Sequence, residues 1–135
     1  MPKCITYVDA NVLVSAFRGK DDVSNEALEV LDDEEREFVI SDILVLETLP
    51  KPKFHKFEDE AKFMEAFFEG ATRKVGSSPE ITESAISLAC QYNLGPRDAL
   101  HVAAAVREKV DEFVTTEKNT KPMFQVQGLK LTSLS

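Results

Sequence analysis

Long apolar runs are missing from this chain of 135 residues. No run approaches the roughly 20 residues that a membrane-spanning helix requires, and residues 1–7 lack the apolar stretch of a secretory signal. Internal repeats, low-complexity tracts and linker-like segments are missing as well. The length is typical of one domain, and 43% hydrophobic residues are enough for a single buried core. We therefore expect one domain spanning residues 1–135, with no membrane-embedded part.

Cysteine and histidine are scarce, which argues against a zinc site. The two cysteines, Cys4 and Cys90, form no C-x-x-C pair, and the two histidines, His55 and His101, lie far apart in the sequence. Both cysteines sit among apolar residues, so we expect buried and reduced thiols. Reduced thiols are typical of cytosolic proteins. The expected location is therefore the cytoplasm.

Basic residues are also in short supply. Lys and Arg number 16 against 24 Asp and Glu, which gives a net charge of −8. This balance argues against a protein that binds nucleic acid through a broad basic face. It does not exclude a nuclease, because acidic residues gathered at a metal site are part of such an enzyme's machinery.

Short β-prone segments alternate with helical patterns along the chain. Strands are expected at residues 4–8, 37–40, 113–116 and 128–132. Helices are expected at residues 11–17, 24–31, from Ser41 or Asp42 to Pro50, and at 57–73, 79–92 and 97–109. This alternation predicts a parallel sheet with helices on both faces. In such sheets the binding crevice lies beyond the carboxyl ends of the strands.

Four acidic residues lie where the ends of these elements should meet. Asp9 directly follows the first strand, Glu47 lies in the helix after the second, Asp98 lies in the first turn of the helix after Gly95-Pro96, and Glu117 follows strand 113–116. Taken singly, Asp9 is equally well explained as a helix cap and Asp98 as a partner of the helix dipole. Converging carboxylates, however, repel each other unless a cation joins them. Mg²⁺ or Mn²⁺ is the cation that favours such ligands.

The ordered set of motifs resembles the PIN-domain family, and within it the VapC-like toxin ribonucleases. The matching segments are Tyr7-Val-Asp-Ala-Asn-Val-Leu13, Ser41-Asp-Ile-Leu-Val-Leu-Glu47, Arg97-Asp-Ala-Leu-His-Val-Ala-Ala-Ala105 and Val114-Thr-Thr-Glu117. Each motif is weak by itself, but their order and spacing match from one end of the chain to the other. The resemblance implies an α/β/α sandwich with a mostly parallel sheet. It also implies metal-dependent cleavage of RNA phosphodiester bonds, a homodimer and a small antitoxin partner.

The resemblance also assigns roles to individual residues. Carried over by position, Asp9, Glu47 and Asp98 are the core catalytic and metal-binding acids. Glu117 falls where the family usually has Asp, which leaves open whether it acts directly or through water. The polar residues Asn11 and Thr115 match positions that orient the site. The implied cleavage products carry a 5′-phosphate and a 3′-hydroxyl.

Several basic residues near the expected crevice are candidate RNA contacts. They are Lys51, Lys53, Arg97 and Lys118. The alternative for the lysines between Pro50 and the next helix is a solvated loop. Phosphate contacts of this kind would position RNA without reading its sequence.

Two other groups of residues have structural interpretations. His101 shares a helix face with Asp98, and we interpret it as a packed or hydrogen-bonding residue beneath the site. Phe57, Phe67 and Phe68 are interpreted as core or interface residues.

Two other functions account for part of the pattern. A catalytically weakened PIN-fold module that binds nucleic acid or protein would explain Glu117 and the acidic charge. A doubly wound phosphoacceptor domain also places Asp after parallel strands. It normally needs an acidic pair after the first strand, where this chain has Asp9-Ala-Asn11.

Overall fold

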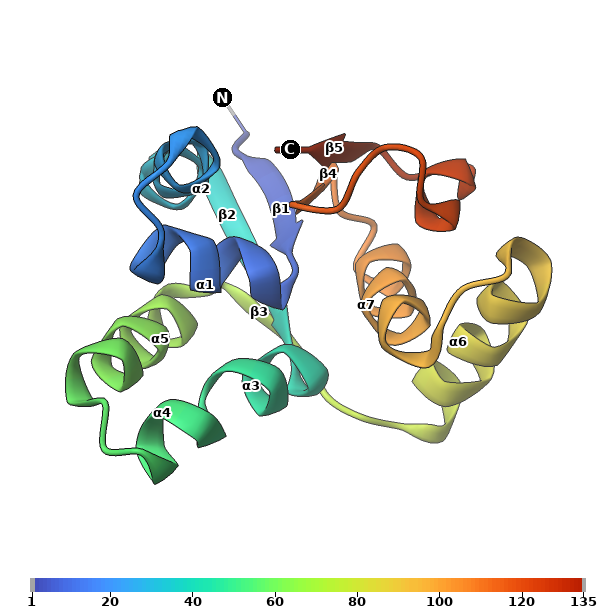
Figure 1. The fold of residues 1–135 in the computed structure, drawn as a ribbon. Helices are drawn as coiled ribbons and strands as arrows, with labels where there is room; N and C mark the ends of the chain where they lie inside the picture. Colours follow the sequence, from blue (N-terminus) through green and yellow to red (C-terminus); the bar gives the residue numbers. More distant parts are fainter. Residues whose placement is uncertain (1, 135) are drawn as a thin grey trace.

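The computed structural model describes residues 2–134. It shows a five-stranded parallel sheet with helices on both faces (Figure 1). The strands are β1 (Cys4–Val8), β2 (Arg36–Ser41), β3 (Arg73–Val75), β4 (Glu112–Thr115) and β5 (Leu131–Ser133). The helices are α1 (Ala10–Arg18), α2 (Asp22–Asp32), α3 (Asp42–Thr48), α4 (Pro50–Phe54), α5 (Glu58–Gly70), α6 (Pro79–Tyr92), α7 (Pro96–Arg107) and the 3-10 helix η1 (Pro122–Gln125). The strand order is β3-β2-β1-β4-β5, and every pairing is parallel. The expected α/β/α architecture is confirmed.

Alternation along the central strands divides the core between the two faces of the sheet. Successive side chains of a strand point to opposite faces. Tyr7 and Phe113 therefore pack with α6 and α7, whereas Val8 and Val114 pack with α1, α2, α3 and α5. All four side chains are fully buried. Figure 1 shows α1 to α5 on one side of the sheet and α6 and α7 on the other.

Local signals in the sequence set most of the helix boundaries. The side chains of Asp21, Ser41 and Ser78 each accept a hydrogen bond from a backbone N–H group in the first turn of the following helix. Pro79 occupies a first-turn position that needs no backbone N–H donor. Asn93 ends α6 in the left-handed conformation, with φ of 58°.

Three short elements were not expected. Pro50 ends one helix, as predicted, but its fixed φ also suits the start of another, so α4 replaces the expected loop. The helix expected to reach residue 73 ends at Gly70, and β3 adds a three-residue edge strand beside β2. The 3-10 helix η1 lies between β4 and β5. Elements this short lack enough residues for a periodic pattern.

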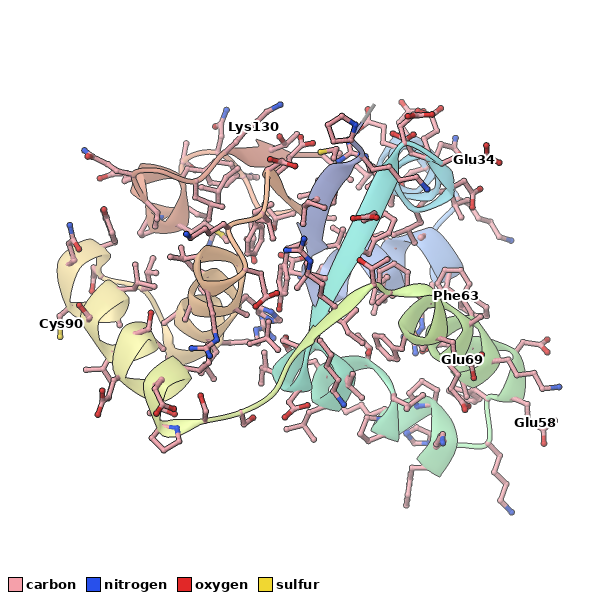
Figure 2. The ribbon with its side chains drawn as sticks, turned by 180° about the vertical axis from the view of Figure 1, so that it is seen from behind. Glu34, Glu58, Phe63, Glu69, Cys90 and Lys130 are labelled. Carbon is pink, nitrogen blue, oxygen red and sulfur yellow. The ribbon has the colours of Figure 1, made fainter. Side chains whose placement is uncertain are left out.

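The expectation of two buried thiols was wrong. Cys4 is half-buried, and Cys90 is exposed on the outer side of α6 (Figure 2). Ile86, one turn before Cys90, is also exposed, because this face of α6 points away from the sheet. Phe67 and Phe68 pack on the core, whereas Phe57 is 51% exposed and lies outside it. None of the helices within residues 2–134 has the length and apolar content needed to cross a membrane.

Candidate active site

A small pocket lies where β1, α1, α3, α7 and the turn after β4 meet. It is lined by Asp9, Ala10, Asn11, Glu47, Arg97, Asp98, His101 and Glu117. Neighbouring parallel strands end at the same edge of a sheet, so β1 and β4 bring Asp9 and Glu117 together. The open space is about 10 Å³, close to the minimum of roughly 10–15 Å³ for one water molecule. All four acids named from the sequence therefore face one narrow pocket.

Asp9 is the buried member of this group. Its side chain caps α1 by accepting a hydrogen bond from the Val12 backbone N–H at 3.3 Å, and it accepts a second from the Thr115 hydroxyl at 2.5 Å. Burial raises the pKa of the Asp9 carboxyl, and the negative charge of Glu117 acts in the same direction. The bond from Thr115 and the proximity of His101 partly offset that increase in pKa. Asp9 is thus a helix cap and a pocket residue at the same time.

Thr115 connects Asp9 with Glu117. Its hydroxyl donates to Asp9 and accepts a hydrogen bond from the backbone N–H of Glu117 at 3.1 Å. Thr115 is fully buried at the end of β4. One side chain thus orients the Asp9 carboxylate and the backbone from which Glu117 extends.

Both carboxylate oxygens of Glu47 are engaged by neighbours on α7. Oε1 forms a close hydrogen bond with Nε2 of His101, and Oε2 forms an ion pair with Nε of Arg97 at 3.2 Å. The Glu47 side chain is only 13% exposed, whereas that of Arg97 is 61% exposed. Arg97 thus extends from solvent into the acidic pocket.

Two further polar residues, Tyr7 and Ser41, lie beneath the pocket and were not identified from the sequence. The Tyr7 hydroxyl lies 2.5 Å from Nδ1 of His101 and 2.7 Å from Oγ of Ser41. A signal for them existed, because a tyrosine in a buried strand needs a hydrogen-bond partner for its hydroxyl. Only the pairing of β1 with β2, which ends at Ser41, and the packing of α7 on the sheet identify those partners.

The chemistry of the acids suits a hard divalent cation. Within residues 2–134, Asp9, Asp98 and Glu117 form no ion pair with Lys, Arg or His. Carboxylates without counter-ions are the ligands that Mg²⁺ and Mn²⁺ prefer. The same part of the chain contains no ready-made group of three or more His, Cys, Asp or Glu side chains around one point. The fit to a cation therefore rests on the chemistry of these acids and on the pocket that they share.

The remaining residues named from the sequence lie at different places. Asn11 is exposed on α1 and lines the pocket. Lys51 and Lys53 are exposed on α4 and do not line it, and Lys53 forms an ion pair with Glu65 at 3.8 Å. Lys118 is exposed in the turn after β4. Of the four candidate RNA contacts, Arg97 is the one that reaches the acids.

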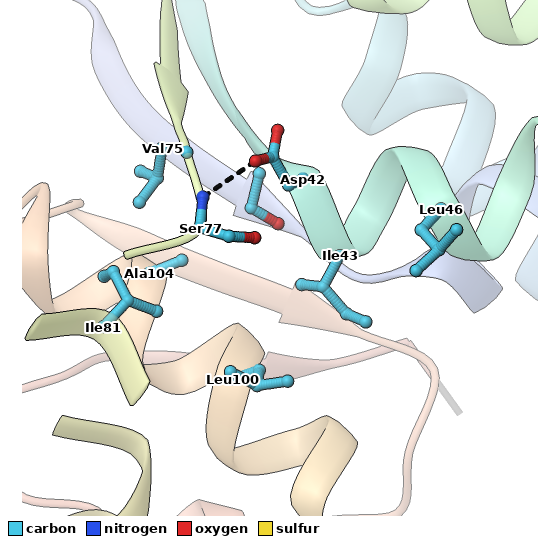
Figure 3. A pocket seen from close by; sticks show the side chains of 10 residues that line it. Asp42, Ile43, Leu46, Val75, Ser77, Ile81, Leu100 and Ala104 are labelled. Atoms are coloured by element: carbon cyan, nitrogen blue, oxygen red, sulfur yellow. Dashed lines mark hydrogen bonds between the residues drawn. The ribbon is translucent and has the colours of Figure 1, made fainter. Parts of the chain in front are cut away.

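A larger hollow of about 250 Å³ lies between α3, β3, α6 and α7 (Figure 3). Ile43, Leu46 and Leu100 contribute apolar side chains to its wall. Its one carboxylate, Asp42, accepts a hydrogen bond from the Ser77 backbone N–H at 2.7 Å. The hollow therefore has neither the clustered acids nor the free carboxylates of the smaller pocket.

Solved structures share this fold at low sequence identity. A chain of the VapBC2 structure from Rickettsia felis, bound to a DNA fragment from the promoter, is 21% identical with a TM-score of 0.71, over 96% of this chain and 98% of that one. A chain of a toxin–antitoxin complex from Klebsiella pneumoniae is 20% identical with a TM-score of 0.71 and the same coverage. A chain of DNA-bound VapBC from Salmonella typhimurium is 16% identical with a TM-score of 0.70, over 100% of both chains.

The family itself is established by the sequence match. No curated protein matches the chain. The family model of the PIN domain matches residues 6–122, from β1 to the start of η1. That match includes all four acids of the pocket. The chain therefore belongs to the PIN-domain family.

Proposed function

We propose that this protein is a Mg²⁺- or Mn²⁺-dependent endoribonuclease and the toxin of a toxin–antitoxin pair. The observation that carries the proposal is the meeting of Asp9, Glu47, Asp98 and Glu117 in one pocket at the carboxyl edge of a parallel sheet. Membership of the PIN-domain family supports the nuclease activity. The likeness to chains from toxin–antitoxin complexes supports an antitoxin partner.

The four acids have different roles in this proposal. Asp9 and Asp98 hold the cation most directly, and Glu47 and Glu117 complete its surroundings. A bound divalent cation activates water and stabilises negative charge on a scissile phosphate. Thr115 keeps the Asp9 carboxylate in place through its hydrogen bond, so Asp9 needs little reorganisation when the cation arrives.

Arg97 is the proposed contact to RNA at the pocket itself, and Asn11 is proposed to help orient the site. The ion pair with Glu47 uses Nε of Arg97, and the guanidinium carries further N–H donors that suit a phosphate. Lys51, Lys53 and Lys118 would contact phosphates farther along the RNA. We also propose that the chain functions as one domain over residues 1–135, in the cytoplasm, as a homodimer.

The test is cleavage of a mixed panel of labelled structured and single-stranded RNAs, with Mg²⁺, with Mn²⁺ and with EDTA. The wild type should cut only with metal, and Asp9→Asn should not cut. Glu83→Gln removes an exposed acid on α6 and serves as the matched control, which should cut like the wild type. Cutting by Asp9→Asn at the wild-type rate would refute the assignment of the site.

The ends of the products give a second readout of the same reaction. In this proposal activated water attacks the phosphorus and the bond to the 3′-oxygen breaks, so cleavage should leave a 5′-phosphate and a 3′-hydroxyl, the ends that the family resemblance implies. A 2′,3′-cyclic phosphate would instead show attack by the ribose hydroxyl, which contradicts the proposed mechanism. A parallel panel of DNA oligonucleotides shows whether the nuclease requires ribose.

One observation favours a second function, a PIN-fold module that binds nucleic acid or protein without efficient catalysis. Both oxygens of Glu47 are already engaged, by Arg97 and His101. A site closed in this way would bind a partner but would not assemble for cleavage. Stabilisation by Mn²⁺ without cutting of any RNA or DNA would support this function over the nuclease.

A further inference from the structure

A chain of hydrogen bonds runs beneath the acidic pocket from Ser41 through Tyr7 and His101 to Glu47. Oγ of Ser41 lies 2.7 Å from the Tyr7 hydroxyl, which lies 2.5 Å from Nδ1 of His101. Nε2 of the same imidazole forms the close hydrogen bond to Glu47. Ser41, Tyr7 and His101 are 3%, 0% and 2% exposed. Water therefore has little access to these groups, and they must satisfy one another.

Counting the protons fixes the direction of the hydrogen bond between His101 and Glu47. An ionised carboxylate only accepts hydrogen bonds, so Nε2 of His101 carries the proton given to Glu47. The Tyr7 hydroxyl can donate to an unprotonated Nδ1 or accept from a protonated one, so it holds the ring in either case. The Ser41 hydroxyl can in turn donate to Tyr7, while its oxygen accepts the Leu44 backbone N–H at 3.2 Å. Every hydroxyl and ring proton of the chain has a partner in this arrangement.

The same chain fixes helix α3 at both ends. Ser41 caps its first turn, and Glu47 lies in its last turn. Tyr7 belongs to β1 and His101 to α7, so the chain joins the central strand to the helices that carry Glu47 and Asp98. The position of Glu47 relative to Asp98 therefore depends on three buried side chains that are not acids.

We infer that His101 is a positioning residue for the Glu47 carboxylate, itself held in place by the Tyr7 hydroxyl, which contacts Ser41 in turn. Its relevance to cleavage rests on the proposed nuclease function. A direct catalytic role does not fit, because Tyr7 and Glu47 engage both ring nitrogens and leave neither for the substrate. The hydrogen bond from Nε2 keeps one oxygen of Glu47 bound and the carboxylate oriented, independently of the ion pair that Arg97 makes with the other oxygen.

The tautomer can be measured without any metal or substrate. Nitrogen-15 NMR of the imidazole rings distinguishes protonation at Nε2, at Nδ1 and at both. His55→Gln leaves His101 as the one histidine, which assigns its signals. We expect a proton on Nε2 of His101 in the wild type at pH 8 and a weaker preference for this position in Tyr7→Phe. A wild-type ring that carries its proton on Nδ1 alone would overturn the inference.

Binding of Mn²⁺ alone separates positioning from general support of the fold. His101→Leu removes the donor to Glu47 and should weaken the Mn²⁺ affinity by about 10- to 100-fold, the usual effect of losing a group that orients a metal ligand. His101→Gln keeps an N–H donor near the position of Nε2 and should restore most of the affinity. With RNA, His101→Leu should lower kcat much more than it raises KM.

These outcomes separate the inference from the proposed function. If the wild type cuts no RNA but His101 carries a proton on Nε2 and the Gln variant restores Mn²⁺ affinity, the nuclease proposal fails and the inference holds. If His101→Leu binds Mn²⁺ and cuts RNA like the wild type, the inference is wrong although the nuclease proposal stands. Should Tyr7→Phe not fold, the tautomer in the wild type still decides.

Discussion

Asp9 shows how one side chain can serve both the fold and the site. As a helix cap it satisfies the Val12 N–H, and as a pocket residue it presents a buried carboxylate beside Glu117. Its raised pKa reflects burial first and the neighbouring charge afterwards. The hydrogen bond from Thr115 stabilises the ionised form that a cation would bind.

Asp98 offers the cleanest test of a pocket acid at the residue scale. It lies in the first turn of α7. The N-cap residue of that helix is Gly95, which has no side chain to accept a hydrogen bond from the first turn. Asp98→Asn should abolish cleavage, whereas the metal-free stability should stay the same or increase, because repulsion within the pocket falls. Urea unfolding with EDTA measures this stability. A large loss would show that Asp98 is a structural residue of α7.

Glu112 begins β4, at the end of the sheet opposite to the acidic pocket, and it should make the stability of the fold depend on pH. Burial alone would raise the pKa of its carboxyl, but hydrogen bonds from Thr132 at 2.5 Å and Arg36 at 2.8 Å outweigh burial and hold that pKa below its usual 4.5. The charged form is therefore favoured in the folded state. Its contribution to stability is present above pH 4.5 and is lost as the pH falls through the lower, folded-state pKa.

Thr132→Val removes one of these bonds and tests that prediction. It should lower the free energy of unfolding at pH 7 by about 1.5 to 3 kcal/mol, the range for a hydrogen bond to a charged group. The loss should shrink as the pH falls below 4.5. Urea unfolding across this pH range measures it. Thr82→Val, which removes a hydroxyl on the exposed side of α6, should have a small and pH-independent effect.

At the scale of elements, α4 carries the exposed lysines that follow the helix of Glu47. Lys51 and Lys53 lie on this five-residue helix, with no acidic residue between Pro50 and Phe57. If both contact phosphates, Lys51→Gln with Lys53→Gln should weaken binding of single-stranded RNA. The slope of log affinity against log salt should become shallower by about 1.4, because each lost phosphate contact reduces its magnitude by about 0.7.

Fluorescence anisotropy with the cleavage-deficient Asp9→Asn background measures this slope. The pair Lys3→Gln and Lys20→Gln removes the same charge from two exposed positions elsewhere and should leave the slope nearly unchanged. Equal changes in both double variants would mean that total charge governs binding and not α4. An unchanged slope in the α4 variant would show that these lysines do not contact the RNA.

At the scale of the whole molecule, cation binding should stabilise the fold. A cation that binds only the folded state stabilises it by about 2.7 kcal/mol at a concentration of 100 times its Kd. Mn²⁺ should therefore raise the Tm of the wild type and should raise that of Asp9→Asn much less. Differential scanning calorimetry with and without EDTA measures the shift, and Glu83→Gln again provides the control. Equal shifts in all three proteins would indicate binding outside the pocket.

Much of the architecture could be predicted because its signals are local. Alternation of short apolar strands with capped helices predicts a parallel sheet, and parallel strands place their carboxyl ends at one edge. The positions of Asp9 and Glu117 after β1 and β4 follow from that rule. Cys90 was misjudged because its sequence neighbours are apolar, while its exposure depends on which face of α6 meets the sheet.

The linear order of residues therefore accounts for the fold class, the family and the set of acids that the pocket shares. It does not account for the pairing of Glu47 with Arg97 and His101, or for the chain through Tyr7 and Ser41. Those contacts join β1, the end of β2, α3 and α7, which meet only when the strands pair and the helices pack on the sheet. Hydrogen bonds need atoms placed within a few tenths of an ångström, and packing of the whole chain sets positions at that precision.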